Sequence, residues 1–259
     1  MNQEERRRFL IEELLRERLS CRRQEIPADT DRQKVLLRSL MNVRHPGAIS
    51  QRFLEVQDAY LQGELAAKKI TRLSELSPLQ NGIYLWRGDI TTLDCGAIVN
   101  AANSGMTGCY QPCHNCIDNC IHTFAGVQLR LKCAEIMEQQ GYEEPTGQAK
   151  ITPAYNLPCD YVIHTVGPIV RGELTRQHCE LLKSCYRSCL ELADENNVGS
   201  IAFCCISTGI FMFPNDRAAE IAVHTVQEYK AETGSKSEVV FNVFKEQDER
   251  IYRKLLSAD

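Results

Sequence analysis

The sequence of 259 residues lacks several features that would assign a class at once. No apolar run approaches the roughly 20 residues that a membrane-spanning helix needs, and the chain begins with charged residues where a secretory signal would be apolar. Neither a Gly-x-Gly-x-x-Gly motif nor a Walker A motif is present, so Rossmann dehydrogenases and P-loop nucleotide triphosphatases have no support. The net charge is -4, and we therefore expect neither nucleic acid nor a membrane among the partners.

Cysteine, by contrast, is abundant, and its number argues against a disulfide framework. The 13 cysteines are an odd number, and they are spread through segments that read as strands and helices. Together with the charged start of the chain, this predicts reduced thiols and a cytoplasmic location. Hydrophobic residues make up 43% and charged residues 25% of the chain, which is typical of a globular protein with a sizeable core.

The first part of the chain predicts a helical extension. Apolar residues recur at helical spacing over residues 4–19, 30–44 and 50–69, with charged residues on the opposite faces. Three amphipathic helices need an apolar surface to cover. We therefore expect residues 1–75 to pack on a second unit, residues 76–259, and an arm that binds a partner protein is the alternative.

In the remaining sequence, short apolar runs alternate with helical patterns, which predicts an α/β fold with helices on both faces of a sheet. The expected strands are 83–87, 95–99, 161–166, 200–206 and 239–244. Ligand sites of such sheets lie at the carboxyl ends of the strands. The segments that follow these strand ends are therefore the candidate positions for a ligand site.

Polar residues after two of the strands each allow two interpretations. Asp89 could accept a hydrogen bond from an adenine amino group, or it could cap the next turn. Asn100 and Asn103 could bind ribose hydroxyls, but asparagine also stabilises turns. Asp118 lies in the first turn of a predicted helix, where an acidic residue is favourable with or without a catalytic role.

Five soft metal ligands fall within twelve residues: Cys109, Cys113, His114, Cys116 and Cys120. Zinc binds Cys and His in tetrahedral geometry, with four protein ligands in structural sites and usually three in catalytic ones. No second Cys/His pair follows at zinc-finger spacing, so a three-ligand site is more natural than a closed finger. Disulfides and ordinary buried thiols are the alternatives.

Three segments resemble, in the right order, the signature segments of macrodomains, the ADP-ribose-binding fold. They are Gly88-Asp89-Ile90-Thr91, Asn100-Ala-Ala-Asn103 and Ile206-Ser207-Thr208-Gly209-Ile210-Phe211. The resemblance covers about residues 50–256. It implies a three-layer α/β/α macrodomain with a mixed central sheet, to which the N-terminal helical extension is added.

The cysteine-rich insert is similar to that of the zinc-dependent macrodomains of bacteria and fungi. In that class the ligand pattern is Cys, four residues, His, one residue, Cys. The resemblance therefore implies one zinc ion (Zn²⁺) per chain on Cys109, His114 and Cys116, with Cys113 and Cys120 outside the site.

The resemblance also implies a role for each motif. Asp89 and Ile90 would hold adenine, and the loop after the 200–206 strand would wrap the diphosphate. Asn103 would position the distal ribose, whereas Asn100 would hold the loop, and Asp118 would orient a water molecule or act as a base. The substrate-binding residues are then Asp89, Ile90, Asn103, Cys109, Ser207, Thr208, Gly209, Ile210 and Phe211, and the catalytic ones are Asp118 and Asn103.

These roles predict a zinc-dependent mono-ADP-ribosyl hydrolase that acts on modified protein side chains, with acidic side chains expected. A non-catalytic ADP-ribose reader with a structural zinc is the alternative, although Asp118 and the metal cluster argue against it. A structural zinc domain for protein assembly is a third hypothesis. Similar macrodomains often occur beside an ADP-ribosylating sirtuin and a lipoyl-carrier homologue, which implies a lipoyl-carrier-type protein, modified by a sirtuin-like transferase, as substrate.

Overall fold

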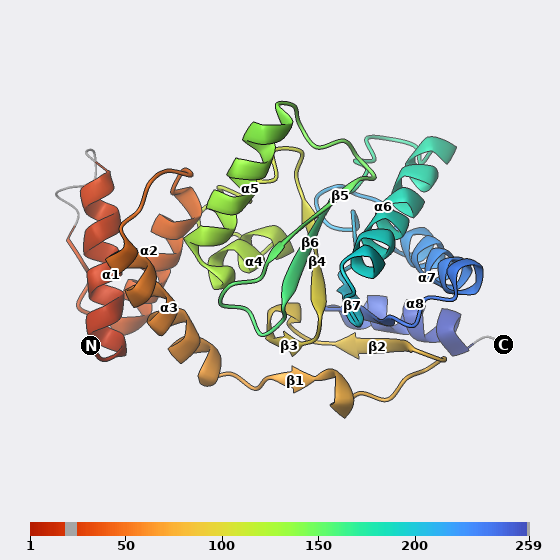
Figure 1. Cartoon of the computed structure of the whole chain (residues 1–259), viewed down its shortest axis with the longest axis horizontal. Coiled ribbons are helices and arrows are strands. Elements are labelled where there is room, and N and C mark those ends of the chain that lie inside the picture. Colours follow the sequence, from red (N-terminus) through yellow and green to blue (C-terminus); the bar gives the residue numbers. More distant parts are fainter. Residues whose placement is uncertain (19–24, 258–259) are drawn as a thin grey trace.

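A computed structural model describes residues 1–18 and 25–257, and its elements form two groups (Figure 1). Three helices near the N-terminus pack together at one end of the molecule, and a sheet flanked by helices makes up the rest. None of the described helices is both long and apolar enough to cross a membrane.

The main sheet has six strands in the order β2-β8-β7-β4-β6-β5. All neighbouring pairs are parallel except β5 and β6, so the sheet is mixed, as predicted. Central side chains such as Val99 and Ala202 are fully buried because both faces are covered. The strands are β2 (Ile83–Arg87), β4 (Ala97–Ala102), β5 (Ala149–Pro153), β6 (Tyr161–Val166), β7 (Ser200–Phe203) and β8 (Glu238–Val243), and two short strands, β1 (Thr71–Arg72) and β3 (Leu93–Asp94), pair separately.

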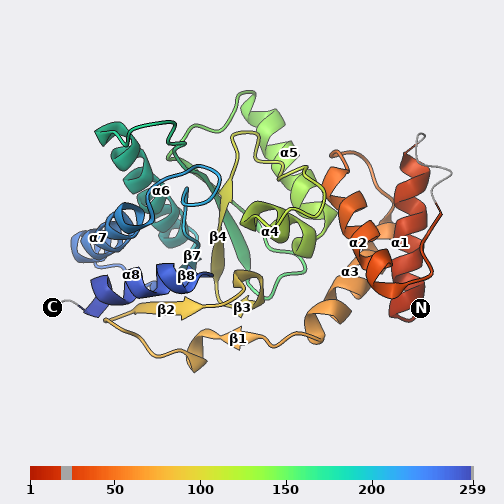
Figure 2. The ribbon, with the colours of Figure 1, turned by 180° about the vertical axis from the view of Figure 1, so that it is seen from behind.

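Helices cover both faces of this sheet. The two opposite views agree that α4 (Ile117–Ala125) and α5 (Val127–Gln140) lie on one side of β4 and β6 (Figures 1 and 2). On the other side lie α6 (Arg176–Glu195) and α7 (Asn215–Thr233). The last helix, α8 (Glu246–Ser257), packs against α7 and β2. This arrangement confirms the predicted α/β/α layers.

The N-terminal extension contains the three predicted helices, α1 (Gln3–Glu17), α2 (Thr30–Val43) and α3 (Gln51–Ala66). Residue 19, the predicted end of the first helix, lies outside the described residues. The Asp29 side chain caps α2 by accepting a hydrogen bond from the third helical N–H. The three helices, with Val127 of α5, bury a core separate from that of the sheet, which includes Leu10, Ile11, Leu14, Leu37, Leu40, Phe53, Val56 and Tyr60.

Polar contacts connect the extension to α4 and α5. Arg130 of α5 donates from Nη1 to three carbonyls at the end of α2, those of Met41 (3.2 Å), Asn42 (2.8 Å) and Arg44 (2.6 Å). The Asn42 side chain in turn donates to Thr123 Oγ1 of α4 at 2.8 Å. The helix α4, which follows the cysteine-rich loop, is therefore held between the sheet and the extension. The boundary between the two units at residue 75 stays a prediction.

Candidate functional site

A pocket of about 960 Å³ lies among the loops that follow the parallel strands. Its size is within the range of small-molecule sites. The carboxyl ends of parallel strands meet at one edge of the sheet, which brings loops distant in sequence together. Every residue predicted for the site lines this pocket: Asp89, Ile90, Asn103, Cys109, His114, Cys116, Asp118, Ser207, Thr208, Gly209, Ile210 and Phe211.

Asp118, the second residue of α4, is a carboxylate of which only 5% is exposed. Its Oδ1 accepts a hydrogen bond from Asn100 Nδ2 at 2.8 Å, and its Oδ2 accepts one from Asn103 Nδ2 at 3.4 Å. Burial raises the pKa of Asp118 to about 6, against the opposing effects of Asn100, the Arg130 charge and Asn103. A carboxylate with a pKa near neutrality is well suited to accept a proton.

A buried chain of hydrogen bonds supports Asp118 from the sheet. Asn100 on β4 pairs with His164 on β6, and both side chains are fully buried. Asn100 Nδ2 lies 3.1 Å from His164 Nδ1, and His164 Nε2 lies 3.0 Å from Thr152 Oγ1. Burial lowers the pKa of His164 to about 3, so the neutral ring accepts from Asn100 and donates to Thr152. Asn100 therefore anchors Asp118 from behind the pocket.

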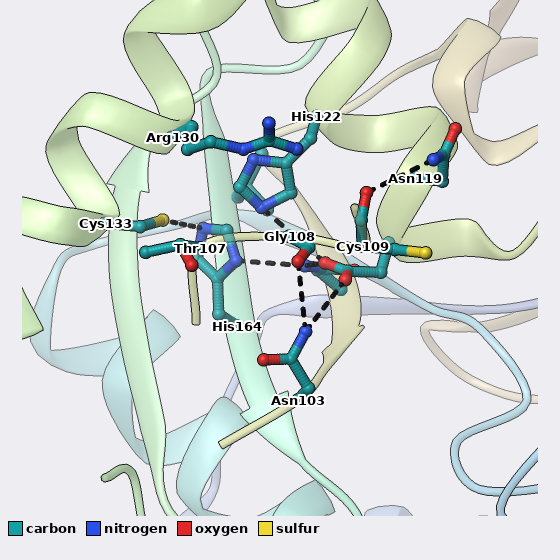
Figure 3. Close-up of polar contacts among 12 residues, drawn as sticks. Asn103, Thr107, Gly108, Cys109, Asn119, His122, Arg130, Cys133 and His164 are labelled. Atoms are coloured by element: carbon teal, nitrogen blue, oxygen red, sulfur yellow. Dashed lines mark hydrogen bonds and ion pairs between the residues drawn. The ribbon is translucent and has the colours of Figure 1, made fainter. Parts of the chain in front are cut away.

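His122 lies one helical turn after Asp118, and neither of its ring nitrogens has a hydrogen-bond partner among the described residues. Its Nε2 is 3.6 Å from Asp118 Oδ1. Burial, together with His164 and Arg130, holds the pKa of His122 well below its usual range. Figure 3 shows the ring between Arg130 and Gly108. Gly108 has φ +86°, and a Cβ there would lie 2.8 Å from the ring, so this position requires glycine.

Asn103 faces the pocket at the start of the loop. Its Oδ1 accepts from the Gly105 N–H at 3.0 Å. Its Nδ2 has two longer contacts, to the Gly108 carbonyl at 3.3 Å and to Asp118 Oδ2 at 3.4 Å (Figure 3). The amide is thus placed beside the buried carboxylate and is loosely enough engaged to bind a ligand hydroxyl.

The three predicted metal ligands come together. The donor atoms of Cys109, His114 and Cys116 all lie within 4.8 Å of one another, and Cys109 Sγ is 3.6 Å from His114 Nδ1. Zinc bonds of about 2.0–2.3 Å in a tetrahedron separate two ligand atoms by about 3.5 Å, so this pair fits a shared ion. Cys116 is also the N-cap of α4 and accepts from the Asn119 N–H at 3.4 Å. The ligand set is therefore tied to the helix that carries Asp118.

A second cluster with metal-ligand chemistry, formed by His122, Cys133 and His164, is fully buried behind the pocket. Figure 3 shows Cys133 beside His164, with a contact of 3.8 Å between Sγ and Nε2. Both nitrogens of His164 already have partners, Asn100 and Thr152, so this ring has no free lone pair for an ion. We therefore interpret this cluster as packing.

Residues of α2 and α4 hold the cysteine-rich loop in place. Asn119 Nδ2 donates to the carbonyls of Cys109 at 3.3 Å and Gln111 at 3.0 Å. Asn42 Oδ1 accepts from the Cys113 N–H at 2.9 Å, and the Cys113 thiol contacts the Val35 carbonyl at 3.5 Å. Cys113 is thus turned toward the extension, away from the three clustered donors.

The segment 207–211 is a loop with unused backbone donors. Ser207 is buried with φ +65°, and its carbonyl accepts from the Phe213 N–H at 3.0 Å, which closes the loop. The N–H groups of Gly209, Ile210 and Phe211 find no acceptor among the described residues. A Cβ added to Gly209 would meet no atom within 4 Å. Free N–H groups beside open space suit a bound anion.

Both interpretations of Asp89 are compatible with its surroundings. Its Oδ1 caps the short helix η3 (Ile90–Thr92) by accepting from the N–H and hydroxyl of Thr91, at 3.0 and 2.6 Å. Its Oδ2 lies 3.8 Å from Lys68 Nζ, and the side chain is 44% exposed. One oxygen therefore caps the turn while the other remains accessible from the pocket.

The sequence did not point to several other residues that line the pocket. Arg38 reaches it from α2, although its helix reads as a surface helix with a charged outer face. Phe244, 79% exposed, follows the last strand, and its position at a strand end was the available signal. Tyr110 and Phe124 also line the pocket from the loop and from α4.

The model of the family described as "Macro domain" matches residues 99–222. Among solved structures, the Oceanobacillus iheyensis macrodomain with ADP is similar with a TM-score of 0.62 and 36% identity, over 70% of this chain and 93% of that one. This chain belongs to the macrodomain family. The Trypanosoma brucei macrodomain in complex with ADP-ribose is similar to it with a TM-score of 0.65 and 29% identity, over 84% and 94% of the two chains.

Relatives of this macrodomain match nearly its whole length. The protein-ADP-ribose hydrolase of Treponema medium is 63% identical over 99% of this chain and 100% of that protein. The protein-ADP-ribose hydrolase of Staphylococcus aureus strain MSSA476 is 49% identical over 97% and 95% of the two chains. Because these matches span nearly all of the macrodomain chain, the extension has a counterpart in both relatives.

Proposed function

We propose that this macrodomain is a zinc-dependent mono-ADP-ribosyl hydrolase that releases ADP-ribose from modified acidic side chains of proteins. The observation that carries the proposal is the position of Asp118, a buried carboxylate, beside three clustered metal ligands in one pocket. A module that only bound ADP-ribose would need neither feature. The name of the two relatives, protein-ADP-ribose hydrolase, supports a hydrolase.

The pocket offers contacts for each part of ADP-ribose. The accessible oxygen of Asp89 accepts from the adenine amino group, and Ile90 assists through its backbone. The free N–H groups of residues 209–211 bind the diphosphate. Asn103 holds a hydroxyl of the distal ribose next to Asp118.

In this proposal Asp118 acts as the general base. Its carboxylate accepts a proton from the water molecule that attacks the ester linkage, a contribution of about 10²–10⁴-fold in rate. The bond between the ADP-ribose and the side chain breaks, the proton passes to the leaving oxygen, and the products are free ADP-ribose and the free side-chain carboxylic acid. The short hydrogen bond from Asn100 fixes the orientation of the carboxylate during this transfer. Asn103 keeps the distal ribose in reach of the same water molecule. Because Asp118 and Asn100 are both buried, the carboxylate has little contact with bulk water.

The zinc ion would bind to Cys109, His114 and Cys116, and it would supply a Lewis acid at the end of the pocket that holds the distal ribose. Two thiolates partly neutralise the ion and weaken this effect. The same three residues join the loop to the N-terminus of α4, so ordering of the loop is a variant of the proposal. We propose a lipoyl-carrier-type protein, modified by a sirtuin-like transferase, as the first substrate to test.

The decisive experiment follows the release of labelled ADP-ribose from an aspartate- or glutamate-linked mono-ADP-ribosylated protein, with and without a strong zinc chelator. Cys116→Ala removes one clustered donor, and Cys113→Ala, whose thiol contacts the extension, is the matched control. We expect chelation and Cys116→Ala to stop release and Cys113→Ala to leave it intact.

The other outcomes select the alternatives. Release that survives verified metal removal, or full activity of Cys116→Ala, would make the zinc structural and leave the chemistry to Asp118. Tight ADP-ribose binding without release from any acidic linkage would identify a reader. Bound zinc without any affinity for ADP-ribose would favour a structural zinc domain.

A further inference from the structure

Arg38 is the one residue of α2 that lines the pocket, so the N-terminal extension contributes to the site directly. Its Nη2 donates to the His114 carbonyl at 2.7 Å and to Asn119 Oδ1 at 3.1 Å, and it lies 3.7 Å from Cys120 Sγ. All three partners belong to the metal-ligand loop or to the first turn of α4. The guanidinium is therefore fixed beside the N-terminus of this helix.

These contacts use only part of the guanidinium. Arginine carries five N–H donors in a planar fork. Arg38 Nε is buried and has no hydrogen-bond partner among the described residues, and within the described part of the chain all hydrogen bonds of this guanidinium come from Nη2. A buried N–H without an acceptor lowers the stability of the fold. The hydrogen bonds of Nη2 fix the guanidinium, so Nη1 is available to a further acceptor.

Backbone donors suited to an anion lie near this guanidinium, although the carboxylates of Asp89, Asp118 and Asp248 line the same pocket. The first two N–H groups of α4, those of Ile117 and Asp118, find no acceptor among the described residues, and a helix N-terminus attracts anions. The same pocket includes the free N–H groups of residues 209–211. Lys245 is the other Lys or Arg side chain of the described chain that lines it.

Building on the proposed function, we propose that Arg38 is a substrate-binding residue that the extension supplies to the diphosphate of ADP-ribose. Nη2 remains on the His114 carbonyl and Asn119, Nε stays buried, and the N–H groups of Nη1 donate to a phosphate oxygen. Arginine suits this role because its permanent charge strengthens a hydrogen bond to a phosphate oxygen. The extension thus completes the binding site, in addition to packing against α4 and α5.

The test measures the dissociation constant of ADP-ribose by calorimetry at 50 and 500 mM NaCl for the full chain and three variants. Arg38→Met removes charge and fork, and Arg38→Lys keeps the charge. Arg44→Met is the matched control, because Arg44 caps the end of the same helix but contacts Glu17 and backbone carbonyls of the extension. Zinc content and thermal unfolding are recorded for each.

We expect Arg38→Met to weaken binding on the order of tenfold to a hundredfold at 50 mM NaCl, as for a lost charge-assisted hydrogen bond. This difference should shrink at 500 mM NaCl, because salt screens partly exposed charges. Arg38→Lys should retain most of the salt dependence, and Arg44→Met should bind within about twofold of wild type, since its side chain does not line the pocket.

Two results would overturn the proposal. Unchanged affinity in Arg38→Met would show that the guanidinium does not reach the ligand. A loss of equal size at both salt concentrations, accompanied by loss of zinc, would show that Arg38 only positions the loop. Wild-type binding and turnover are measured in parallel. If the wild type fails to bind ADP-ribose, the proposed function itself fails, whereas a wild type that binds and hydrolyses beside unaffected Arg38 variants contradicts this inference alone.

Discussion

Asn100 and Asn103 are the same amino acid three positions apart. Their surroundings predict that substitution of the first lowers mainly stability and substitution of the second lowers mainly activity. The Asn100 side chain is fully buried and donates to both Asp118 Oδ1 and His164 Nδ1. In Asn100→Ala both acceptors lose a buried donor, at about 1–3 kcal/mol each. We therefore expect a loss of about 2–6 kcal/mol in the free energy of unfolding, which corresponds to a decrease of roughly 4–24 °C in Tm for a chain of this size.

Asn103→Ala should behave differently. Its side chain is half-buried, and its Nδ2 contacts are long, 3.3 and 3.4 Å, so we expect a stability loss below about 1 kcal/mol. Its loss removes the amide that faces the pocket beside Asp118. We expect release of ADP-ribose to fall by at least about tenfold, as for one lost hydrogen bond of about 1.4 kcal/mol to the reacting group.

The assay combines thermal unfolding followed by circular dichroism with label release from an ADP-ribosylated protein, on the same preparations and below both Tm values. Asn100→Ala should shift Tm strongly, and Asn103→Ala should shift activity strongly at a nearly unchanged Tm. Equal Tm shifts in the two variants, or full activity of Asn103→Ala, would refute the division into an anchoring and a ligand-facing asparagine.

Three further predictions concern the neighbourhood of Asp118. Asp118→Asn should keep the fold and bind ADP-ribose but lower kcat by about 10²–10⁴-fold in the release assay, and a variant with wild-type kcat would exclude it as the base. Gly108→Ala places a Cβ 2.8 Å from the His122 ring at φ +86° and should lower the free energy of unfolding by at least about 1 kcal/mol in urea, so an unchanged midpoint would contradict the packing described. The pKa of His164 is about 3 in the folded protein against an ordinary value of 6.5, so its contribution to stability is complete above pH 6.5 and declines as pH falls toward 3. Between pH 7.5 and 5 the free energy of unfolding of wild type should therefore fall by about 2 kcal/mol more than that of His164→Gln. Parallel stability curves of the two proteins would show that the ring does not stay neutral.

Most of the pocket-lining residues named from the sequence could be predicted because they follow the end of a strand. Residues 89 and 211 are more than a hundred positions apart in the sequence. A parallel sheet nevertheless places the strand ends that precede Asp89, Asn103 and loop 207–211 at one edge. Neither side-chain contacts nor register was needed for this inference. The resemblance to macrodomains added the ligand-binding role that we expect of each loop.

The choice among five soft ligands needed more than spacing. The sequence alone left three-ligand combinations open, and the resemblance selected Cys109, His114 and Cys116. The physical reason for the exclusion of Cys113 is its backbone: φ is +52°, and the thiol contacts the Val35 carbonyl in the extension. Such a backbone conformation is uncommon for residues other than glycine, and the local sequence does not predict it.

Arg38 could not be predicted, for a different reason. Its contacts to His114, Asn119 and Cys120 span 76 to 82 residues of sequence. On α2 it reads as one more charged residue on a solvated face. Its position in the pocket follows only from how the extension docks on α4, which depends on contacts such as those of Arg130 with the end of α2. Tertiary docking of this kind has no periodic signature in the chain.

The helix α4 explains why the metal-ligand loop and the extension belong to one site. One side of α4 carries Asp118, which Asn100 ties to the sheet. Its N-cap is Cys116, a proposed metal ligand, and Asn119 binds the loop carbonyls on one edge and Arg38 on the other. A shift of the extension would therefore move the loop and the helix N-terminus together, and with them Asp118, against its hydrogen bond from Asn100 on the sheet. The position of Asp118 and of the proposed metal ligands relative to the sheet thus depends on α2, although α2 lies outside the α/β/α layers.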